Sequence, residues 1–156
     1  MGPPGSGKSF LGCELAEQGV AAFVSLGEQA ALHAHLAEIG SVMLRSCFEQ
    51  LREQDLVVAL EAHGSADRAL LEGLQCAFRV ALVRVDAERE LCIERVVSRA
   101  AERHLHAAAD PDAVGRFYDA WRAQIAPTYA FDLAVDGTDV DHASAGIRSF
   151  LSCRGF

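Results

Sequence analysis

Apolar residues follow two patterns that alternate along this chain. Short, mostly apolar runs at 20–26, 56–60, 79–85 and 131–135 predict β-strands, and the continuous run at 56–60 is typical of a strand covered on both faces. Helical periodicity predicts helices over 7–18, 28–39, 42–54, 65–76, 87–103, 110–125 and 141–152. This alternation predicts an α/β fold, a three-layer α/β/α sandwich with a parallel sheet.

The first predicted helix is preceded by a glycine-rich segment, Gly2-Pro-Pro-Gly-Ser-Gly-Lys-Ser9, which matches the phosphate-loop pattern Gly-x-x-x-x-Gly-Lys-Ser. Glycines let backbone N–H groups approach phosphate oxygens, and the helix N-terminus adds partial positive charge. We expect Lys8 to reach the β- and γ-phosphates and Ser9 to bind Mg²⁺. A chance glycine-rich turn is the alternative, and eight fitting residues argue against it. The nucleotide-contacting residues expected here are Gly2, Pro3, Pro4, Gly5, Ser6, Gly7, Lys8, Ser9 and Phe10.

A phosphate loop of this kind normally follows a buried strand, yet only Met1 precedes Gly2. Either the chain begins late or the sheet lacks its central strand, so the first strand of the P-loop NTPase fold is apparently missing. We favour a truncated start. The missing strand should matter, because a central strand anchors neighbours on two sides and aims the loop.

The strand predicted at 56–60 is followed by Glu61, and a carboxylate in this place can orient Mg²⁺ directly or through water. Glu61 is therefore a candidate catalytic and metal-binding residue together with Ser9. An ordinary acidic residue at a strand end is the alternative. His63 follows in a short polar loop at the carboxyl end of the strand, where it is either an acceptor contact or a surface histidine.

Arg95, Arg99 and Arg103 are spaced four residues apart and therefore share one face of a predicted helix. Three guanidinium groups suit a polyphosphate ligand. The alternative is a solvated stripe paired with neighbouring glutamates. Because the row precedes a segment suited to closing over a ligand, we expect a short lid at about 100–114.

The acceptor side is less defined by the sequence. Glu28 follows the second predicted strand and is a candidate base or acceptor contact, or a helix first-turn acid. Arg68 is the favoured acceptor arginine, since it lies close to the sheet edge. Phe117, Tyr118 and Trp121 are expected in the core rather than in a stacking platform.

Composition narrows the classes of function. The 156 residues fit a single domain over 1–156, and 51% of them are hydrophobic, enough for one buried core. The formal charge of −8 argues against broad binding to nucleic acid. No apolar run is long enough for a membrane span, and no secretory signal is found, so we expect a cytoplasmic protein. Its scattered cysteines predict buried, reduced thiols.

The motifs together resemble the phosphate-loop kinases of nucleotides and small molecules, a group that includes adenylate kinase, shikimate kinase and AAA-type kinase-like ATPases. The loop is similar to that of adenylate kinase, and residues 93–99 resemble the start of its lid. Pro127-Thr-Tyr129 with residues 132–138 is similar to the end of shikimate kinase. The resemblance implies that Arg95 stacks on adenine, that Arg99 contacts phosphate, and that the base lies near Gly137 and Thr138.

The resemblance implies a phosphotransferase that moves the γ-phosphoryl group of ATP, with Mg²⁺, to a small acceptor. The candidate catalytic residues are Lys8, Glu61, Arg99 and Glu28. The acceptor is unidentified, because the paired aspartates and the Gly-Gly-Gly loop of shikimate kinase have no counterpart. A nucleotide-binding module or regulatory AAA-type ATPase without a dedicated acceptor is the alternative.

Overall fold

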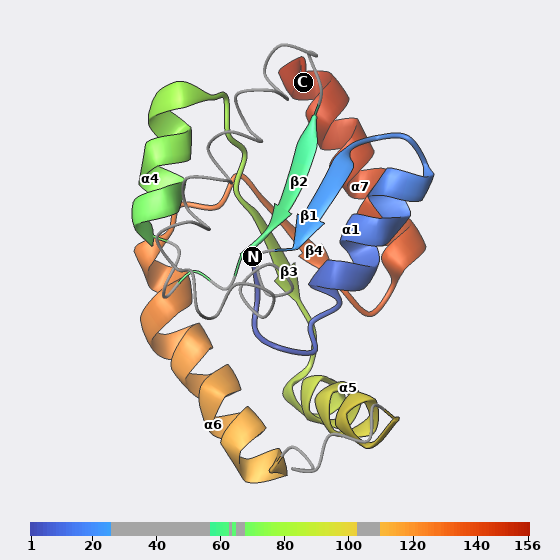
Figure 1. Cartoon of the computed structure of the whole chain (residues 1–156), viewed down its shortest axis with the longest axis vertical. Coiled ribbons are helices and arrows are strands. Elements are labelled where there is room, and N and C mark those ends of the chain that lie inside the picture. The colour runs from blue at the N-terminus through green and yellow to red at the C-terminus, as the bar shows by residue number, and fades with distance from the viewer. Residues whose placement is uncertain (26–56, 63, 65–67, 103–109) are drawn as a thin grey trace, which may run out of the picture.

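The computed structural model describes residues 1–25, 57–62, 64, 68–102 and 110–156 (Figure 1). The helices predicted at 28–39 and 42–54 lie outside these residues. The helices are α1 (Lys8–Glu17), α4 (Arg68–Ala77), α5 (Arg89–Glu102), α6 (Pro111–Ala120) and α7 (Val140–Arg154). The strands are β1 (Ala22–Ser25), β2 (Val58–Glu61), β3 (Val83–Asp86) and β4 (Leu133–Asp136).

The strands pair in parallel, as the alternating pattern predicts. In one pair β1 runs beside β2, with Ser25 opposite Glu61. In the other pair β3 runs beside β4, with Asp86 opposite Asp136. The sheet is thus divided into two pairs, and within the part of the chain that the structure describes no strand lies between β2 and β3.

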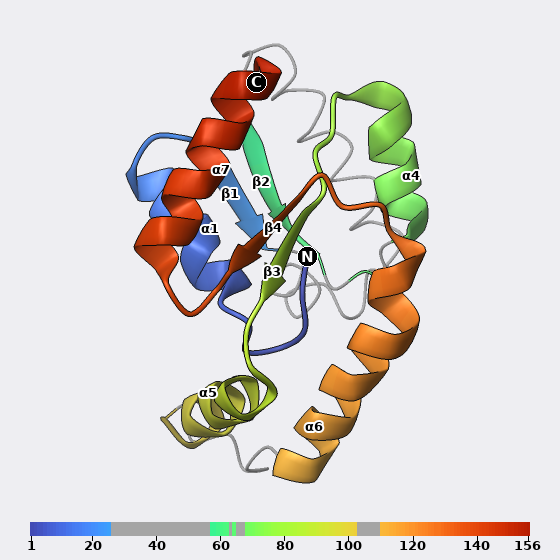
Figure 2. The same ribbon diagram turned by 180° about the vertical axis from the view of Figure 1, so that it is seen from behind.

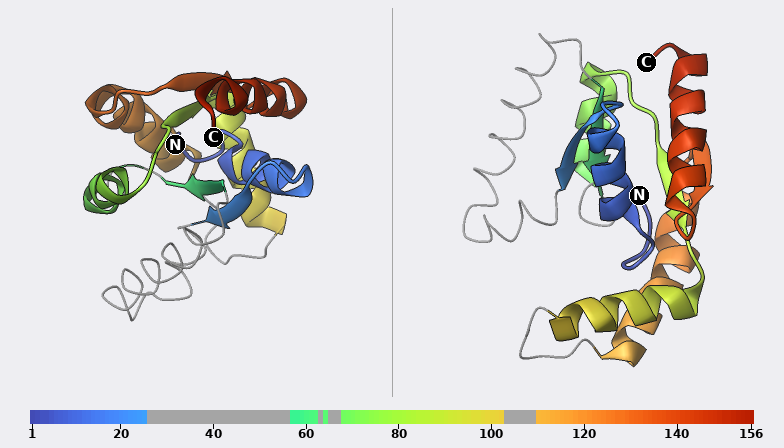
Figure 3. Two further views of the ribbon diagram at one scale, coloured as in Figure 1. Left: turned by 90° about the horizontal axis from the view of Figure 1, so that it is seen from above. Right: turned by 90° about the vertical axis from the view of Figure 1, so that its right-hand side faces the viewer.

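Helices cover both sides of the paired strands, which gives the predicted three layers (Figures 2 and 3). Helices α1 and α7 pack against each other on one side, and α4 and α6 lie on the other. A buried cluster joins α1 to α7 across β3 through the side chains of Leu11, Leu15, Val85, Ala143 and Ile147. A second cluster on the α4 side contains Met1, Ala62, Leu71 and Leu82.

Two predicted elements differ in extent from the structure. The strand predicted from residue 79 begins at Val83, and the backbone N–H of Leu82 donates to the carboxylate of Asp132 at 2.9 Å instead of to a strand. The helix predicted over 110–125 begins as expected, with the Asp110 side chain accepting from the Asp112 N–H. It ends as an α-helix at Ala120 and continues as a π-helix, Trp121–Ile125, and a 3₁₀ turn, Ala126–Thr128.

The core predictions are confirmed only in part. Trp121 is fully buried, but Phe117 is 42% exposed on α6, so its predicted place in the core is wrong. The four cysteines within the described residues are free as predicted, but of these four only Cys92 is buried, while Cys13, Cys76 and Cys153 are exposed. Among the described helices, none combines the length and the apolar character that crossing a membrane requires.

Candidate functional site

The glycine-rich segment forms a tight loop that leads directly into α1. Gly5 and Gly7 have φ angles of 80° and 96°, a left-handed conformation that glycine adopts without a Cβ penalty. Gly7 is the N-cap of α1 and makes no side-chain cap, so the helix N-terminus is left to other partners. The expected phosphate-loop shape, with a helix start behind it, is therefore present.

Close contacts with other elements hold the loop in this shape. A Cβ on Gly2 would lie 2.4 Å from the carbonyl oxygen of Val85 in β3. A Cβ on Gly5 would lie 2.3 Å from the carbonyl oxygen of Cys92 in α5. A Cβ on Gly137, after β4, would lie 1.8 Å from the Ser6 carbonyl oxygen. Glycine at these positions is thus required by packing of the loop against β3, α5 and the segment after β4.

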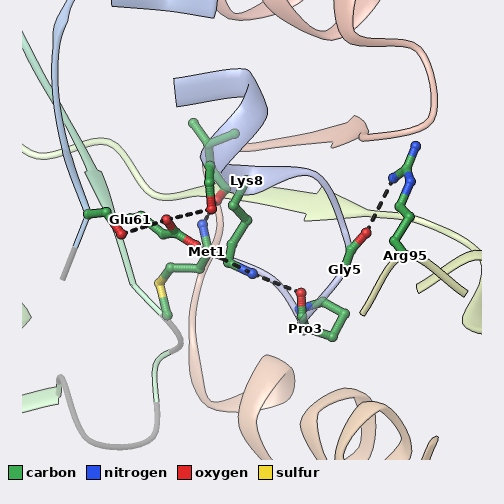
Figure 4. Close-up of polar contacts among 9 residues, drawn as sticks. Met1, Pro3, Gly5, Lys8, Glu61 and Arg95 are labelled. Atoms are coloured by element: carbon green, nitrogen blue, oxygen red, sulfur yellow. Dashed lines mark hydrogen bonds and ion pairs between the residues drawn. The ribbon is translucent and has the colours of Figure 1, made fainter. Parts of the chain in front are cut away.

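Lys8 lies inside the loop, with 6% of its side chain exposed (Figure 4). Its Nζ donates to the Pro3 carbonyl oxygen at 2.8 Å and lies 4.0 Å from a carboxylate oxygen of Glu61. Burial lowers the pKa of Lys8 from 10.5 to about 8, and the Glu61 charge opposes this shift. The ammonium group is therefore poorly solvated, and a bound anion would stabilise its charge.

Glu61 accepts hydrogen bonds from two hydroxyl groups at the carboxyl ends of β1 and β2. Its Oε2 atom accepts hydrogen bonds from Ser9 at 2.9 Å and from Ser25 at 3.0 Å. Ser9 is the second residue of α1, and Ser25 lies opposite Glu61 in the parallel register. The structure thus brings Ser9 and Glu61 together, as their positions in the sequence suggested.

Arg95 approaches the other side of the loop from α5 (Figure 4). Its Nη1 donates to the carbonyl oxygens of Gly5 at 3.3 Å and Gly137 at 3.2 Å. Arg95 therefore links the phosphate loop to the segment after β4, and Arg95 and Gly137, both expected near the nucleotide, are brought together.

The residues present fit a magnesium-bound triphosphate. The hydroxyl of Ser6 is buried and has no hydrogen-bond partner in the described part of the chain, so the loop contains a polar atom available to a ligand. Hydroxyl and carboxylate oxygens of Ser9, Ser25 and Glu61 meet within hydrogen-bonding distance, and Mg²⁺ prefers oxygen ligands. Lys8 would hold phosphate oxygens, and Ser9 with Glu61 would hold the cation.

Four other nucleotide candidates are either exposed or outside the described residues. Arg99 is exposed on α5, and its positive charge contributes to the lowered pKa of Lys8. Thr138 is exposed, and its N–H donates to the Asp136 carboxylate at 2.8 Å. Phe10 is 65% exposed on α1. Arg103 lies outside the described residues.

The described residues do not bring together the residues that the sequence suggested for binding the acceptor. Glu28, His63 and part of the expected lid at 100–114 lie outside them. Arg68 begins α4 and pairs with Glu72 at 3.1 Å, with both side chains more than 60% exposed. The structure thus gives Arg68 a surface partner on its own helix.

Two residues of the site region were not singled out in the sequence. Ser25 holds Glu61, and the available signal was a hydroxyl at the end of a strand that runs parallel to the one ending in Glu61. Met1 lies beside Lys8, whose charge affects the Met1 amine. No sequence pattern indicates this second contact, because it arises from tertiary packing.

Comparisons with known proteins found a solved structure with a similar fold but no matching family. No family model matches the chain, and no curated protein matches it. Among solved structures, the chain is similar to the crystal structure of shikimate kinase from Aquifex aeolicus, with 19% sequence identity and a TM-score of 0.57. The similarity covers 99% of this chain and 94% of that one. The chain therefore shares the α/β fold of that structure, with parallel strands and a phosphate loop, as the sequence pattern predicted.

Proposed function

We propose that this protein binds ATP with Mg²⁺ in the loop at 2–9 and transfers the γ-phosphoryl group to a small acceptor. The observation that carries the proposal is the meeting of Lys8, Ser9 and Glu61 at the N-terminus of α1. Backbone amides, one buried cation and an oxygen cluster in this arrangement suit a magnesium-bound triphosphate. The fold similarity to a kinase supports the class of reaction.

Each group has a defined task in this proposal. Lys8 exchanges the Pro3 carbonyl for phosphate oxygens and stabilises charge that builds up as the γ-phosphoryl group leaves. The N–H groups of the loop and of the first turn of α1 orient the phosphates. Arg95 and Arg99 add positive charge from α5, at the side of the site where a lid over 100–114 would begin.

Mg²⁺ would neutralise negative charge on the phosphate oxygens when bound. Ser9 supplies a hydroxyl oxygen, and Glu61 keeps that hydroxyl oriented through its 2.9 Å hydrogen bond. Ser25 fixes Glu61 from the neighbouring strand at 3.0 Å. Because phosphoryl transfer depends on positioning and charge, these contacts should affect turnover more than folding.

Measuring ATP consumption with and without a panel of nucleotides, nucleosides, sugars and sugar acids tests the reaction. Turnover that an acceptor stimulates, with a phosphorylated acceptor as product, supports the kinase. Acceptor-independent hydrolysis, or binding without turnover, would contradict the kinase and favour a nucleotide-binding module or regulatory AAA-type ATPase. Activity that survives Lys8→Ala would show that the site is misplaced.

A further inference from the structure

Arg95 lies where three segments that are distant in the sequence meet. It belongs to α5, and its Nη1 atom donates to the carbonyl oxygen of Gly5 in the phosphate loop and to that of Gly137 after β4 (Figure 4). Arg95 is half-buried, whereas Arg99, one turn further along α5, is exposed. The two arginines therefore have different surroundings although they share one face of the helix.

Carbonyl oxygens, rather than a carboxylate, are the partners of the Arg95 guanidinium group. None of the ion pairs between described residues includes Arg95. Hydrogen bonds from a charged donor are roughly twice as strong as those between neutral groups. Two such bonds therefore hold the carbonyls firmly, and in the described part of the chain no carboxylate neutralises the guanidinium charge.

The bond to Gly5 helps to fix one peptide group of the phosphate loop at both of its polar atoms. Arg95 binds the carbonyl oxygen of Gly5 at 3.3 Å. The N–H of the same peptide group, on Ser6, donates to the Pro3 carbonyl oxygen at 3.3 Å. Because a peptide group is planar and rigid, these two bonds set its orientation together. Lys8 donates to the same Pro3 oxygen at 2.8 Å, so the position of its ammonium group is linked to this peptide group and to Arg95.

The bond to Gly137 attaches the loop to the paired strands β3 and β4. The Gly137 N–H donates to the Asp86 carbonyl oxygen at 2.7 Å, and Asp86 is the last residue of β3. A Cβ on Gly137 would lie 1.8 Å from the Ser6 carbonyl oxygen, so this segment also touches the loop directly. Arg95 thus joins a peptide group of the loop to a point that the β3–β4 pair holds in place.

We propose that Arg95 positions the phosphate loop for any polyphosphate: its bonds to the loop and to the segment after β4 keep the loop amides and Lys8 in place, with or without a base on the phosphates. This inference rests on the proposed function and assigns Arg95 a role in it that does not depend on the base. The N–H groups of a guanidinium point within its plane, so a base that stacks on its face leaves both carbonyls bound. Stacking alone would instead make Arg95 matter for ATP and not for inorganic tripolyphosphate.

The test compares Arg95→Ala with Arg148→Ala, which removes an exposed charge from α7. Calorimetric titration measures the affinity of each variant for ATP and for inorganic tripolyphosphate, both with Mg²⁺. We expect Arg95→Ala to weaken the binding of both ligands by about 10-fold or more, since two hydrogen bonds from a charged donor are lost. Arg148→Ala should change neither affinity. Arg95→Lys, which keeps a charged donor, should recover part of the affinity for both ligands.

A spectroscopic readout reports the two bonds themselves. In protein labelled with ¹³C at the glycine carbonyls, the Gly5 and Gly137 signals should shift in Arg95→Ala and stay unchanged in Arg148→Ala, before any ligand is added. A substitution that only lowered overall stability, which Tm measures, would leave both signals in place while the chain remains folded. The readout therefore separates positioning of the loop from a general structural effect.

Loss of ATP binding alone in Arg95→Ala, with tripolyphosphate binding unchanged, would overturn the proposal and leave Arg95 as a contact of the base. Unchanged Gly5 and Gly137 signals would overturn it as well, as would an unaltered chain that binds ATP and not tripolyphosphate. In these cases the unaltered chain still binds ATP, so the proposed function stands. An unaltered chain that binds neither ligand would contradict the proposed function, and the role given to Arg95 would fall with it.

Discussion

A groove of about 780 Å³ lies between β2 and the segment that leads into β3, and its carboxyl and amino ends are built differently. At the carboxyl end Glu61 connects the two halves of the molecule, because it forms an ion pair with Lys8 at 4.0 Å and accepts a hydrogen bond from Ser9 at 2.9 Å. At the amino end β2 and the segment before β3 face each other across apolar side chains, with no strand between them in the described residues. At the carboxyl end, side-chain contacts thus connect the two strand pairs, which in a continuous sheet would be connected by backbone hydrogen bonds.

This difference shows what the site depends on. Gly2 and Gly137 pack the phosphate loop against the β3–β4 half, and Gly5 packs it against α5, whereas Glu61 belongs to the β1–β2 half. The distance between the phosphate loop and the Glu61 carboxylate therefore depends on how the β1–β2 pair is placed relative to the β3–β4 pair.

The largest expected effect comes from removing the buried cation at the carboxyl end. Lys8→Ala should reduce turnover on the order of 1,000-fold, the upper end for losing one charge-stabilising donor. Steady-state ATP consumption measures this loss. Arg148→Ala, which removes an exposed charge on α7, is the control and should leave turnover unchanged. Comparable losses in both variants would point to general destabilisation.

Removing the charge of Glu61 should weaken the binding of Mg²⁺ by the oxygen atoms of Ser9, Ser25 and Glu61, while ATP still binds in the phosphate loop. Glu61→Gln is expected to lower turnover about 100-fold and to raise the Mg²⁺ concentration needed for half-maximal rate. Glu72→Gln changes an exposed glutamate on α4 and serves as the control. An unchanged magnesium requirement in Glu61→Gln would exclude Glu61 from the metal site.

The packing of the loop against the β3–β4 half can be tested with glycines. Gly137→Ala would place a Cβ 1.8 Å from the Ser6 carbonyl oxygen, so we expect a loss of about 2 kcal/mol in unfolding free energy. Gly146→Ala in α7 meets no atom within 4 Å and should stabilise by about 0.5–1 kcal/mol. Denaturant titration compares them, and equal values would disprove close packing at Gly137.

The last prediction concerns the buried amine of Met1. Its pKa is lower in the folded chain, about 5, than the ordinary 8.0, so the unfolded chain binds the proton more tightly in between. Stability should therefore rise with pH between these values, by about 1.4 kcal/mol per unit near pH 6–7. Nα-acetylation should remove this part of the pH dependence. Identical slopes for the acetylated and free chains would contradict a buried amine.

The sequence predicted the parts of the molecule that local patterns specify. The loop at 2–9 was recognisable because every residue type in it has a task, and its glycines do adopt left-handed angles at positions 5 and 7. Alternating apolar runs predicted parallel strands, and Glu61 at a strand end pointed to its meeting with Ser9. Each of these follows from a few neighbouring residues and a general rule.

Contacts between distant segments were beyond that reasoning. Ser25 reaches Glu61 only because β1 and β2 pair in one register, which no local pattern fixes. The requirement for Gly137 arises from the approach of the loop to the end of β4. Phe117 was placed in the core from its type, although its position on α6 leaves it exposed.

The most direct test of the account follows the one lysine in the chain. With ¹³C-labelled lysine, Lys8 gives a single set of side-chain NMR signals whose titration reports its pKa. We predict a pKa of about 8 without nucleotide, and a clear rise with saturating ATP and Mg²⁺ as phosphate oxygens replace the Pro3 carbonyl. A Lys8 signal whose position and pKa do not change with ATP would contradict the claim that this loop holds a triphosphate.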